Sequence, residues 1–403
     1  MDELDQQIFV LLLEDPFRSI NDIAKILEVS FKKVNTRIDL MKEKGIIRKE
    51  NKINDPIFGE RVETHVSANI NTNNLGLIRD HVIFYDIPNK ETLNHLELFC
   101  DIHPYTTYRS KLLNNKFGLY VQFDYPPQLK EDLIQMYKYI GHILHLKFNR
   151  IIGTEMVYLK PSFFYENHLQ YQNIINKNED KTSGMIDFFW NKYNEEKKNR
   201  KLKIINQIDS LSPMDVSYLS EIQLKLLREL TINGIVSITD LSTYYDRDKS
   251  TISRHVAAIK EKYIRNGILY FKPDLNQSFN SFKLISGTFS FGNRMTKVEF
   301  QEFISSQEFP FHGYFIFDND NNTFIMYIAT NYLHYPEIFD LLMTVTDKIY
   351  VYEIDINQSN KYYFYNLNFD EKGKFNTDKK YFFDDPLEEL AKLMNDDPIL
   401  ALN

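Results

Sequence analysis

The stretch SINDIAKILEVSFKKVNTRIDLMKEKGI, which runs from Ser19 to Ile46, decides the fold that the sequence predicts. Ser19 and Ser30 each precede a run of apolar residues at helical spacing, as helix N-caps do, and Gly45 supplies a helix stop. A lead helix is expected over Leu4–Glu14. Three short, closely spaced helices indicate a helix-turn-helix, and the two β-leaning runs that follow Gly45 predict its winged hairpin.

The same pattern recurs later in the chain as SITDLSTYYDRDKSTISRHVAAIKEKYI, from Ser237 to Ile264. The two stretches align without a gap at a constant offset of 218 residues, with apolar residues opposite apolar residues and caps opposite caps. Each copy is followed by segments with the pattern strand, helix, strand, strand, helix, strand. The chain is therefore expected to contain the same two-part module twice.

This repeat predicts the α+β class: two copies of a winged helix-turn-helix, each followed by a βαββαβ ferredoxin-like domain, related as a pseudo-twofold pair. In chain order, the expected boundaries are a winged helix-turn-helix at 1–66, a ferredoxin-like effector or dimerisation domain at 67–160, a linker with a charged helix at 161–220, a second winged helix-turn-helix at 221–275, a second ferredoxin-like domain at 276–370 and an acidic tail at 371–403. We expect the tail to be dispensable for folding because it offers few apolar residues to bury.

Composition argues against several other classes of protein. Among 403 residues, 48 Lys and Arg against 56 Asp and Glu give a net charge of −8, too acidic for a uniformly basic coat on nucleic acid. The motifs GxGxxG, GxxxxGK, HExxH and GxSxG are absent, and Cys100 is the only cysteine. We therefore expect no cofactor, no metal site and no catalytic residue. No apolar stretch approaches the roughly 18 residues of a membrane helix, so a cytoplasmic location without a membrane partner is expected.

The second helix of each helix-turn-helix carries the residues expected to contact DNA. Its N-terminal side chains reach base edges in the major groove, and nearby basic residues meet phosphates. Apolar residues at helical spacing should face inward, so the polar residues between them point outward. The expected DNA-binding residues are Lys32, Lys33, Asn35, Thr36, Arg37, Arg48 and Lys49 in the first copy, and Lys249, Ser250, Thr251, Ser253, Arg254 and His255 in the second. Residues 31–52 and 247–272 each carry a net charge of +5, which favours this interpretation.

A separate group of polar and aromatic residues lies in the first ferredoxin-like domain. His103, Tyr105, Tyr108 and Arg109 are close together in the sequence and form a candidate ligand site. The alternative is an ordinary strand edge, because Tyr105 and Tyr108 need only a half-buried pleated surface. The sequence leaves both interpretations open.

With the lead helix LDQQIFVLLLED before it, the stretch from Ser19 to Ile46 resembles the Lrp/AsnC (feast/famine) family of archaeal and bacterial transcription regulators, and the resemblance covers both copies. It implies a sequence-specific regulator that binds double-stranded DNA, has no enzymatic activity and can take a small-molecule effector. Members of this family usually carry one module and dimerise. The resemblance therefore implies an intramolecular pseudo-dimer here, with further homo-oligomers left open. Because the two recognition helices differ, the preferred operator should be asymmetric.

Two other functions stay open at the level of sequence. The siroheme decarboxylases resemble the same family and use His and Arg around a tetrapyrrole, roles in which His103 and Arg109 could be cast. Their recognition helices would have no need to be basic, and the second copy has Phe309 and Phe315 at the aligned places. A protein-interaction scaffold with vestigial helix-turn-helices is the other alternative, and it predicts no affinity for DNA at moderate salt.

Overall fold

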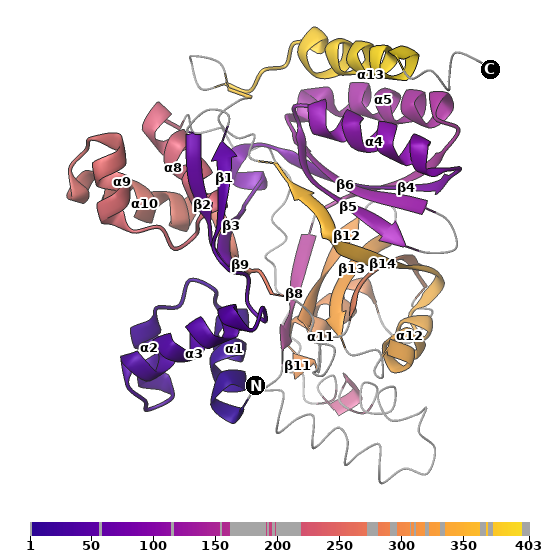
Figure 1. The fold of residues 1–403 in the computed structure, drawn as a ribbon. Helices are drawn as coiled ribbons and strands as arrows, with labels where there is room; N and C mark the ends of the chain where they lie inside the picture. Colours follow the sequence, from indigo (N-terminus) through magenta and orange to yellow (C-terminus); the bar gives the residue numbers. More distant parts are fainter. Residues whose placement is uncertain are drawn as a thin grey trace. The chain divides into compact units, whose positions relative to one another are not determined.

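The structure is a computed structural model in which helices and antiparallel sheets alternate along the chain, and this confirms the α+β class (Figure 1). It describes residues 2–55, 59–113, 117–153, 155–161, 191, 193–195, 198, 219–271, 281–290, 296–306, 308–309, 312–318, 322–330, 335–362, 368–369 and 374–396. Within these ranges, no helix combines the length and the apolar character that crossing a membrane requires. Most of the expected linker, 161–220, and the end of the acidic tail lie outside the described residues.

The chain divides into two compact units, and each unit is built from separated segments. The first unit comprises Met1–Asn51, Thr154–Ser210 and Ile268–Glu353; the second comprises Lys52–Gly153, Leu211–Gly267 and Ile354–Asn403. Each unit thus joins the helix-turn-helix of one repeat to the βαββαβ segment of the other repeat. The boundaries expected from the sequence describe the repeat along the chain, whereas the compact units exchange parts between the copies.

In the helix-turn-helix of the first unit, two of the helices begin at serine caps, as the sequence predicts. Its helices are α1 (Glu3–Glu14), α2 (Ile20–Ile26) and α3 (Phe31–Glu43). The Ser19 hydroxyl accepts a hydrogen bond from the Asp22 N–H at 3.1 Å, and the Ser30 hydroxyl accepts one from the Lys33 N–H at 3.3 Å. Gly45 follows with a φ of +73°, a left-handed conformation that favours glycine after a helix end. The buried apolar side chains include Ile8, Ile23, Val34, Ile38 and Met41.

The helix-turn-helix of the second unit repeats this plan. Its helices are α8 (Glu221–Ile232), α9 (Ile238–Tyr245) and α10 (Lys249–Tyr263). Both α1 and α8 span 12 residues, and they start 218 positions apart. The Ser237 hydroxyl accepts a hydrogen bond from the Asp240 N–H at 3.0 Å, and Ile252, Val256 and Ile259 are buried. The local signals of the repeat therefore form the same local structure twice.

Strands next to each helix-turn-helix come from the other repeat. In the second unit, β3 (Val66–Ile70) pairs with β9 (Ile264–Leu269), and the Asn69 side-chain amide donates to Asn266 Oδ1 at 2.9 Å. In the first unit, Ile47 forms a β-bridge with Phe271. The expected winged hairpin is present as β1 (Asn51–Asp55) paired with β2 (Gly59–Glu63).

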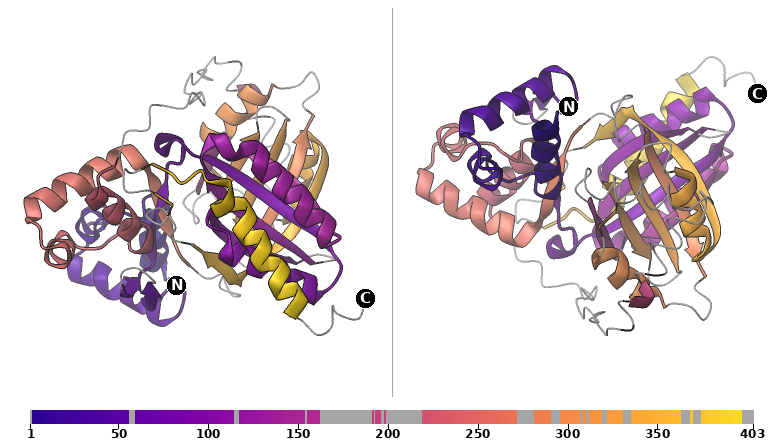
Figure 2. Two further views of the ribbon diagram at one scale, coloured as in Figure 1. Left: turned by 90° about the horizontal axis from the view of Figure 1, so that it is seen from above. Right: turned by 90° about the horizontal axis from the view of Figure 1, so that it is seen from below.

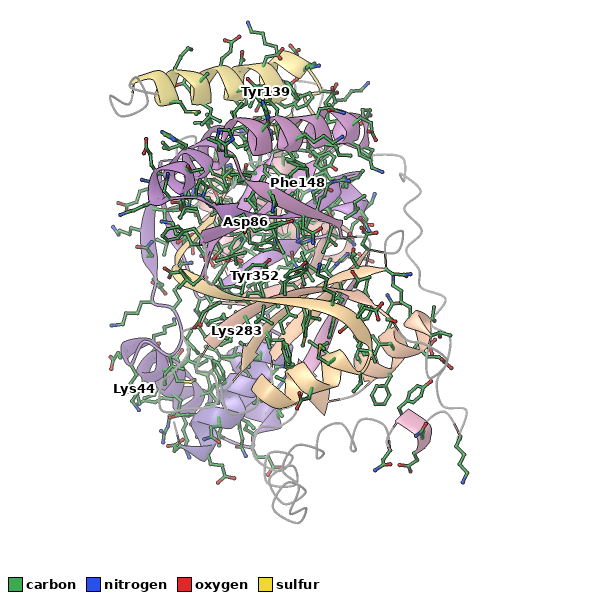
Figure 3. All side chains as sticks on the ribbon, turned by 90° about the vertical axis from the view of Figure 1, so that its right-hand side faces the viewer. Lys44, Asp86, Tyr139, Phe148, Lys283 and Tyr352 are labelled. Atoms are coloured by element: carbon green, nitrogen blue, oxygen red, sulfur yellow. The ribbon has the colours of Figure 1, made fainter. Side chains whose placement is uncertain are left out.

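The ferredoxin-like part of the second unit has helices on one face of its sheet (Figure 1). Its elements are β4 (Ile78–Ile87), α4 (Lys90–Ile102), β5 (Thr106–Leu113), β6 (Phe117–Tyr125), η2 (Pro127–Leu129), α5 (Lys130–Ile143) and β7 (Lys147–Ile152). The strand order is β5-β6-β4-β7, with antiparallel neighbours. Phe148 of β7 packs between Phe84 and Tyr137, with ring centroids 6.3 and 5.9 Å away, while Tyr139 on α5 is half exposed (Figure 3).

The ferredoxin-like part of the first unit has the same order of elements. They are β10 (Ser281–Phe289), α11 (Lys297–Ser306), β11 (Glu308–Phe309), β12 (His312–Asp318), β13 (Thr323–Thr330), α12 (Tyr335–Met343) and β14 (Thr346–Lys361). The strands run β12-β13-β10-β14, and β8 (Glu155–Pro161) extends this sheet antiparallel to β12. Lys283 and Tyr352 lie on the adjacent strands β10 and β14 (Figure 3). Phe289, Phe300, Phe315 and Phe324 form its aromatic core.

The C-terminal segment belongs to the second unit, and its structure corrects the argument from its composition. It forms η4 (Lys380–Asp384) and α13 (Asp385–Asp396), which lies against α4 (Figure 2). Phe382 and Leu390 are 1% and 0% exposed. The expectation that this segment buries few apolar residues was wrong, because the acidic residues occupy the outer face of a helix whose inner face is apolar.

Candidate nucleic-acid interface

Helix α3 presents two exposed lysines at its N-terminal end. Lys32 and Lys33 are exposed, while Val34 and Ile38 anchor the helix in the core of the first unit. The polar residues of the next turn are already engaged within the helix. The Asn35 side-chain amide donates to Asp39 Oδ2 at 3.0 Å, and the Thr36 hydroxyl donates to the Lys32 carbonyl at 2.9 Å. Base contacts from Asn35 or Thr36 would have to replace these bonds.

Arg37, expected from the sequence to contact bases, is paired with carboxylates at the start of α1. Its Nη1 atom lies 2.5 Å from Asp2 Oδ2 and 3.3 Å from Asp5 Oδ1. Asp2 and Asp5 also form the capping box of α1, with the Asp5 N–H donating to Asp2 Oδ1 at 2.9 Å. That backbone hydrogen bond, together with the Arg37 guanidinium, lowers the pKa of Asp2. Arg37 therefore lies on the polar face of α3, and its side chain is paired with the N-terminal end of α1.

Arg48 and Lys49 lie after α3, where the chain approaches a strand of the second repeat. The Arg48 N–H donates to the Tyr270 carbonyl at 2.9 Å, and the Arg48 guanidinium lies over the Tyr270 ring, 5.1 Å from its centroid. Lys49 is exposed. Arg48 is thus held by its neighbours, whereas Lys49 can reach a phosphate.

Helix α10 presents a more open face than α3. Ile252, Val256 and Ile259 face the core, so the intervening positions point to solvent. Lys249, Ser250, Ser253 and Arg254 are exposed, and Thr251 and His255 are half-buried. Within the described part of the chain, neither a hydrogen bond nor an ion pair engages the Arg254 side chain. Its guanidinium is free to approach a base edge or a phosphate.

A groove of about 790 Å³ opens beside the N-terminal end of α10 in the second unit. It is lined by Ile222, Ser242, Thr243, Asp246, Arg247, Asp248, Lys249, Thr251 and His255. The turn before α10 is fixed by Asp246, whose φ of +48° is left-handed, and by the Ser242 hydroxyl, which donates to the Arg247 carbonyl at 2.5 Å. Its basic side chains and hydroxyls suit a phosphate, whereas its two aspartates would repel one.

The second helix-turn-helix is braced by a residue of the winged hairpin, which sequence reasoning missed. Arg61 of β2 donates through Nε to Glu229 Oε1 at 2.8 Å, and its guanidinium lies 4.2 Å from the centroid of the Tyr244 ring. The Tyr245 hydroxyl donates to the same Glu229 oxygen at 2.9 Å. Burial is the largest single influence on the pKa of Arg61 and acts to lower it. Hydrogen bonds to Tyr244 and Glu229, together with the Glu229 charge, outweigh burial and raise the pKa. Glu229, which stands among the apolar residues of the last turns of α8, is the signal that could have revealed this pair.

Two residues of the candidate ligand site, Tyr108 and Arg109, are bound by different partners. Arg109 is bound by the carboxylates of Glu97 and Asp101 on α4, and its Nε atom lies 2.9 Å from Asp101 Oδ1. The Tyr108 hydroxyl donates instead to Ser359 Oγ at 3.1 Å. In an antiparallel strand such neighbours point to opposite faces of the sheet. The interpretation as a shared ligand site stays a prediction.

His103 and Tyr105 lie beneath the C-terminal segment of the second unit. His103 is 3% exposed, and burial lowers its pKa to about 3, with the Phe382 backbone opposing that shift. The Tyr105 hydroxyl donates to the Asn376 carbonyl, and burial raises the pKa of Tyr105. A covered neutral His103 and an Arg109 paired with two carboxylates do not fit a shared site for a tetrapyrrole. Within the described ranges, no group of three or more His, Cys, Asp or Glu residues could hold a metal ion.

Comparison with known families gives one match in this region. Residues 1–48 match a family model described as winged helix-turn-helix DNA-binding. This segment of the chain is therefore a DNA-binding type of helix-turn-helix, in agreement with the geometry of α1, α2 and α3. A search of curated protein sequences finds no match.

The solved structures similar to this chain include an enzyme and transcription regulators. The siroheme decarboxylase NirDL is 11% identical, with 98% of this chain and 100% of that chain covered and a TM-score of 0.46. An AsnC family transcriptional regulator from Agrobacterium tumefaciens is 20% identical, with 38% of this chain and 91% of that chain covered and a TM-score of 0.26. The leucine response regulatory protein LrpA of Mycobacterium tuberculosis is 14% identical, with 38% and 91% covered and a TM-score of 0.24.

The match over nearly the whole chain corrects one expectation from the sequence. NirDL is an enzyme, and its structure, alone and in complex with an iron-uroporphyrin III analogue, covers 97–98% of this chain. The expectation from the sequence that the chain has no enzymatic activity was therefore wrong.

Proposed function

We propose that this chain is a sequence-specific regulator of transcription of the Lrp/AsnC type, which binds double-stranded DNA with α3 and α10 in the major groove. The exposed face of α10 is the observation that carries the proposal. Short hydroxyl side chains at Ser250 and Ser253 allow close approach of the backbone, and Arg254 can donate to guanine O6 and N7 together. The buried apolar positions of α10 fix this face outward.

Phosphate contacts are assigned to the basic residues that flank each recognition helix. Lys249 and Arg247 line the groove at the start of α10, and Lys32, Lys33 and Lys49 are exposed around α3. These contacts would position the protein on the duplex without reading its sequence. Asp246 and Asp248 in the same groove would disfavour indiscriminate contact with phosphate, which suits site-specific binding.

The two copies are proposed to replace the two subunits of a dimeric regulator. In such regulators the recognition helices contact half-sites roughly 34–36 Å apart, or a multiple of that spacing. Pairing of the two sheets within one chain, binding of a small-molecule effector and action in the cytoplasm belong to the same proposal. Because α3 and α10 carry different polar residues, the preferred operator is expected to be asymmetric.

The proposal is tested by selecting bound duplexes from a random pool and measuring affinity at increasing salt. Binding should weaken steeply with salt, because each neutralised phosphate adds about 0.9 to the slope of log K against log salt. Arg254→Ala should cost about 1–3 kcal/mol at one position of the selected site. Lys138→Ala, an exposed charge change on α5, is the matched control and should bind as the wild type does. A flat salt dependence, or equal effects of the two variants, would contradict the proposal.

A further inference from the structure

We propose that Asp2 and Asp5 form a carboxylate clamp that holds Arg37 away from DNA. The second helix-turn-helix then supplies most of the affinity for DNA, and the first contributes less. This inference rests on the proposed function, since it concerns how strongly each recognition helix binds.

The clamp in the first copy is made of charged groups at close range. Arg37 Nη1 lies 2.5 Å from Asp2 Oδ2 and 3.3 Å from Asp5 Oδ1, and the Arg37 side chain is 29% exposed. Asp5 is nearly buried, with 4% of its side chain exposed, so it cannot move away without opening the N-terminal turn of α1. A phosphate or base would have to compete with two carboxylates for one guanidinium.

The second copy has the same helices and no clamp. At the offset of 218, Asp2 and Asp5 correspond to Ser220 and Gln223, and Arg37 corresponds to His255. Ser220 and Gln223 close a neutral capping box, in which the Ser220 N–H donates to Gln223 Oε1 at 3.0 Å. Across the described residues, His255 has no carboxylate partner. The helix of the second copy thus begins with a neutral pair of residues at the positions that the two acids occupy in α1.

The consequence is an inequality between the two recognition helices. On α3 the arginine is clamped, and Asn35 and Thr36 are bonded within the helix. On α10, Ser250, Ser253 and Arg254 are exposed. Exchanging an intramolecular ion pair for a phosphate contact adds little to the free energy of binding DNA, because one charged hydrogen bond replaces another. Releasing Arg37 should add one strong contact to DNA.

The second copy supplies the substitutions for the test. The double substitution Asp2→Ser, Asp5→Gln introduces the capping box of α8 into α1. Helix capping is retained while the clamp is lost. Arg37→Ala is then made in the wild type and in this released variant. Binding of all four proteins to a labelled mixed-sequence duplex of about 30 base pairs is measured by fluorescence anisotropy over a salt series. Comparing the effect of Arg37→Ala in the two backgrounds cancels the general effect of removing two negative charges.

We expect Arg37→Ala to weaken the released variant by about tenfold or more and the wild type by less than about threefold. The salt slope of the released variant should be steeper by about 0.9, and Arg37→Ala should remove that increase. Equal effects of Arg37→Ala in both backgrounds would overturn the clamp while leaving DNA binding intact. Absence of binding by the wild type and the released variant alike would overturn both the clamp and the proposed function.

The converse transfer gives an independent readout. Ser220→Asp, Gln223→Asp and His255→Arg together build the clamp into the second copy, and the triple variant should bind the same duplex more weakly than His255→Arg alone. Thermal unfolding of each variant verifies that the helices remain folded. Tighter or unchanged binding by the triple variant would contradict the clamp.

Discussion

Glu229 in α8 is the residue whose substitution most directly tests how the second helix-turn-helix is held together. It is 5% exposed, and its Oε1 atom accepts hydrogen bonds from Arg61 Nε at 2.8 Å and from the Tyr245 hydroxyl at 2.9 Å. The substitution Glu229→Gln preserves the shape of the side chain and removes its charge. Arg61, with 11% of its side chain exposed, then loses the carboxylate that balances it.

The expected loss of stability follows from this burial. Removing one partner of a buried ion pair costs about 3–5 kcal/mol, because the remaining charge stays out of water without compensation. Arg61 keeps a bond from Nη1 to the Glu60 carbonyl at 2.9 Å and its stacking on Tyr244. We therefore expect a loss at or just below the lower end of that range, about 2–3 kcal/mol.

The same helix supplies the matched control. Glu221 in α8 pairs with Lys225 at 2.5 Å, but 82% of its side chain is exposed. Glu221→Gln makes the same chemical change where water already screens the charge, so the free energy of unfolding should hardly change. Both variants are compared with the wild type by urea unfolding followed by circular dichroism, at equal ionic strength.

A Glu229→Gln variant as stable as Glu221→Gln would refute the reasoning. A second variant separates charge from packing: Arg61→Met combined with Glu229→Gln removes both charges and should recover much of the lost stability. If the double variant is no more stable than Glu229→Gln alone, the loss comes from altered packing and the electrostatic account is wrong.

Two further predictions concern stability. Leu390→Ala should cost about 2–5 kcal/mol because this side chain of α13 is fully buried, whereas Glu389→Ala beside it should change little; equal urea midpoints for the two variants would show that α13 is dispensable after all. His103, with a folded pKa of about 3 against 6.5 for an ordinary histidine, gains its proton on unfolding between those values, so stability should fall as pH drops through this window; at pH 5 the wild type should have lost about 2 kcal/mol more, relative to pH 7, than His103→Leu, and parallel pH profiles would contradict this assignment.

The repeat could be predicted from the sequence because its signals are local. Ser19, Ser30 and Ser237 each lie within three residues of the N–H group that they cap, and apolar spacing within one helix defines its buried face. Each βαββαβ segment likewise follows from the order of short patterns along the chain. Each of these signals lies within about ten consecutive residues, so both copies could be recognised from the sequence. Their lead helices begin 218 positions apart, as the alignment of the two copies predicts.

What could not be predicted depends on residues far apart in the chain. The pairing of β3 with β9 joins positions about two hundred residues apart, and no local pattern distinguishes this partner from the nearer strand β2. Arg37 was expected to face DNA because helical spacing places it outward, but spacing within α3 carries no information about the carboxylates of α1. Leu390 was overlooked because net charge describes a segment as a whole, whereas burial follows one face of a helix.

Duplication within one chain has a consequence that a pair of identical subunits could not have. In a homodimer, a substitution in the cap of the lead helix would appear in both helix-turn-helices and would restrain or release both recognition helices together. Here the cap is acidic in α1 and neutral in α8, so one arginine can be held by carboxylates while the other recognition helix stays open. In the proposed regulator, the strength of each half-site contact can therefore change separately. An asymmetric operator is the outcome that such separate adjustment favours, because a palindrome would offer both helices the same bases although they carry different side chains.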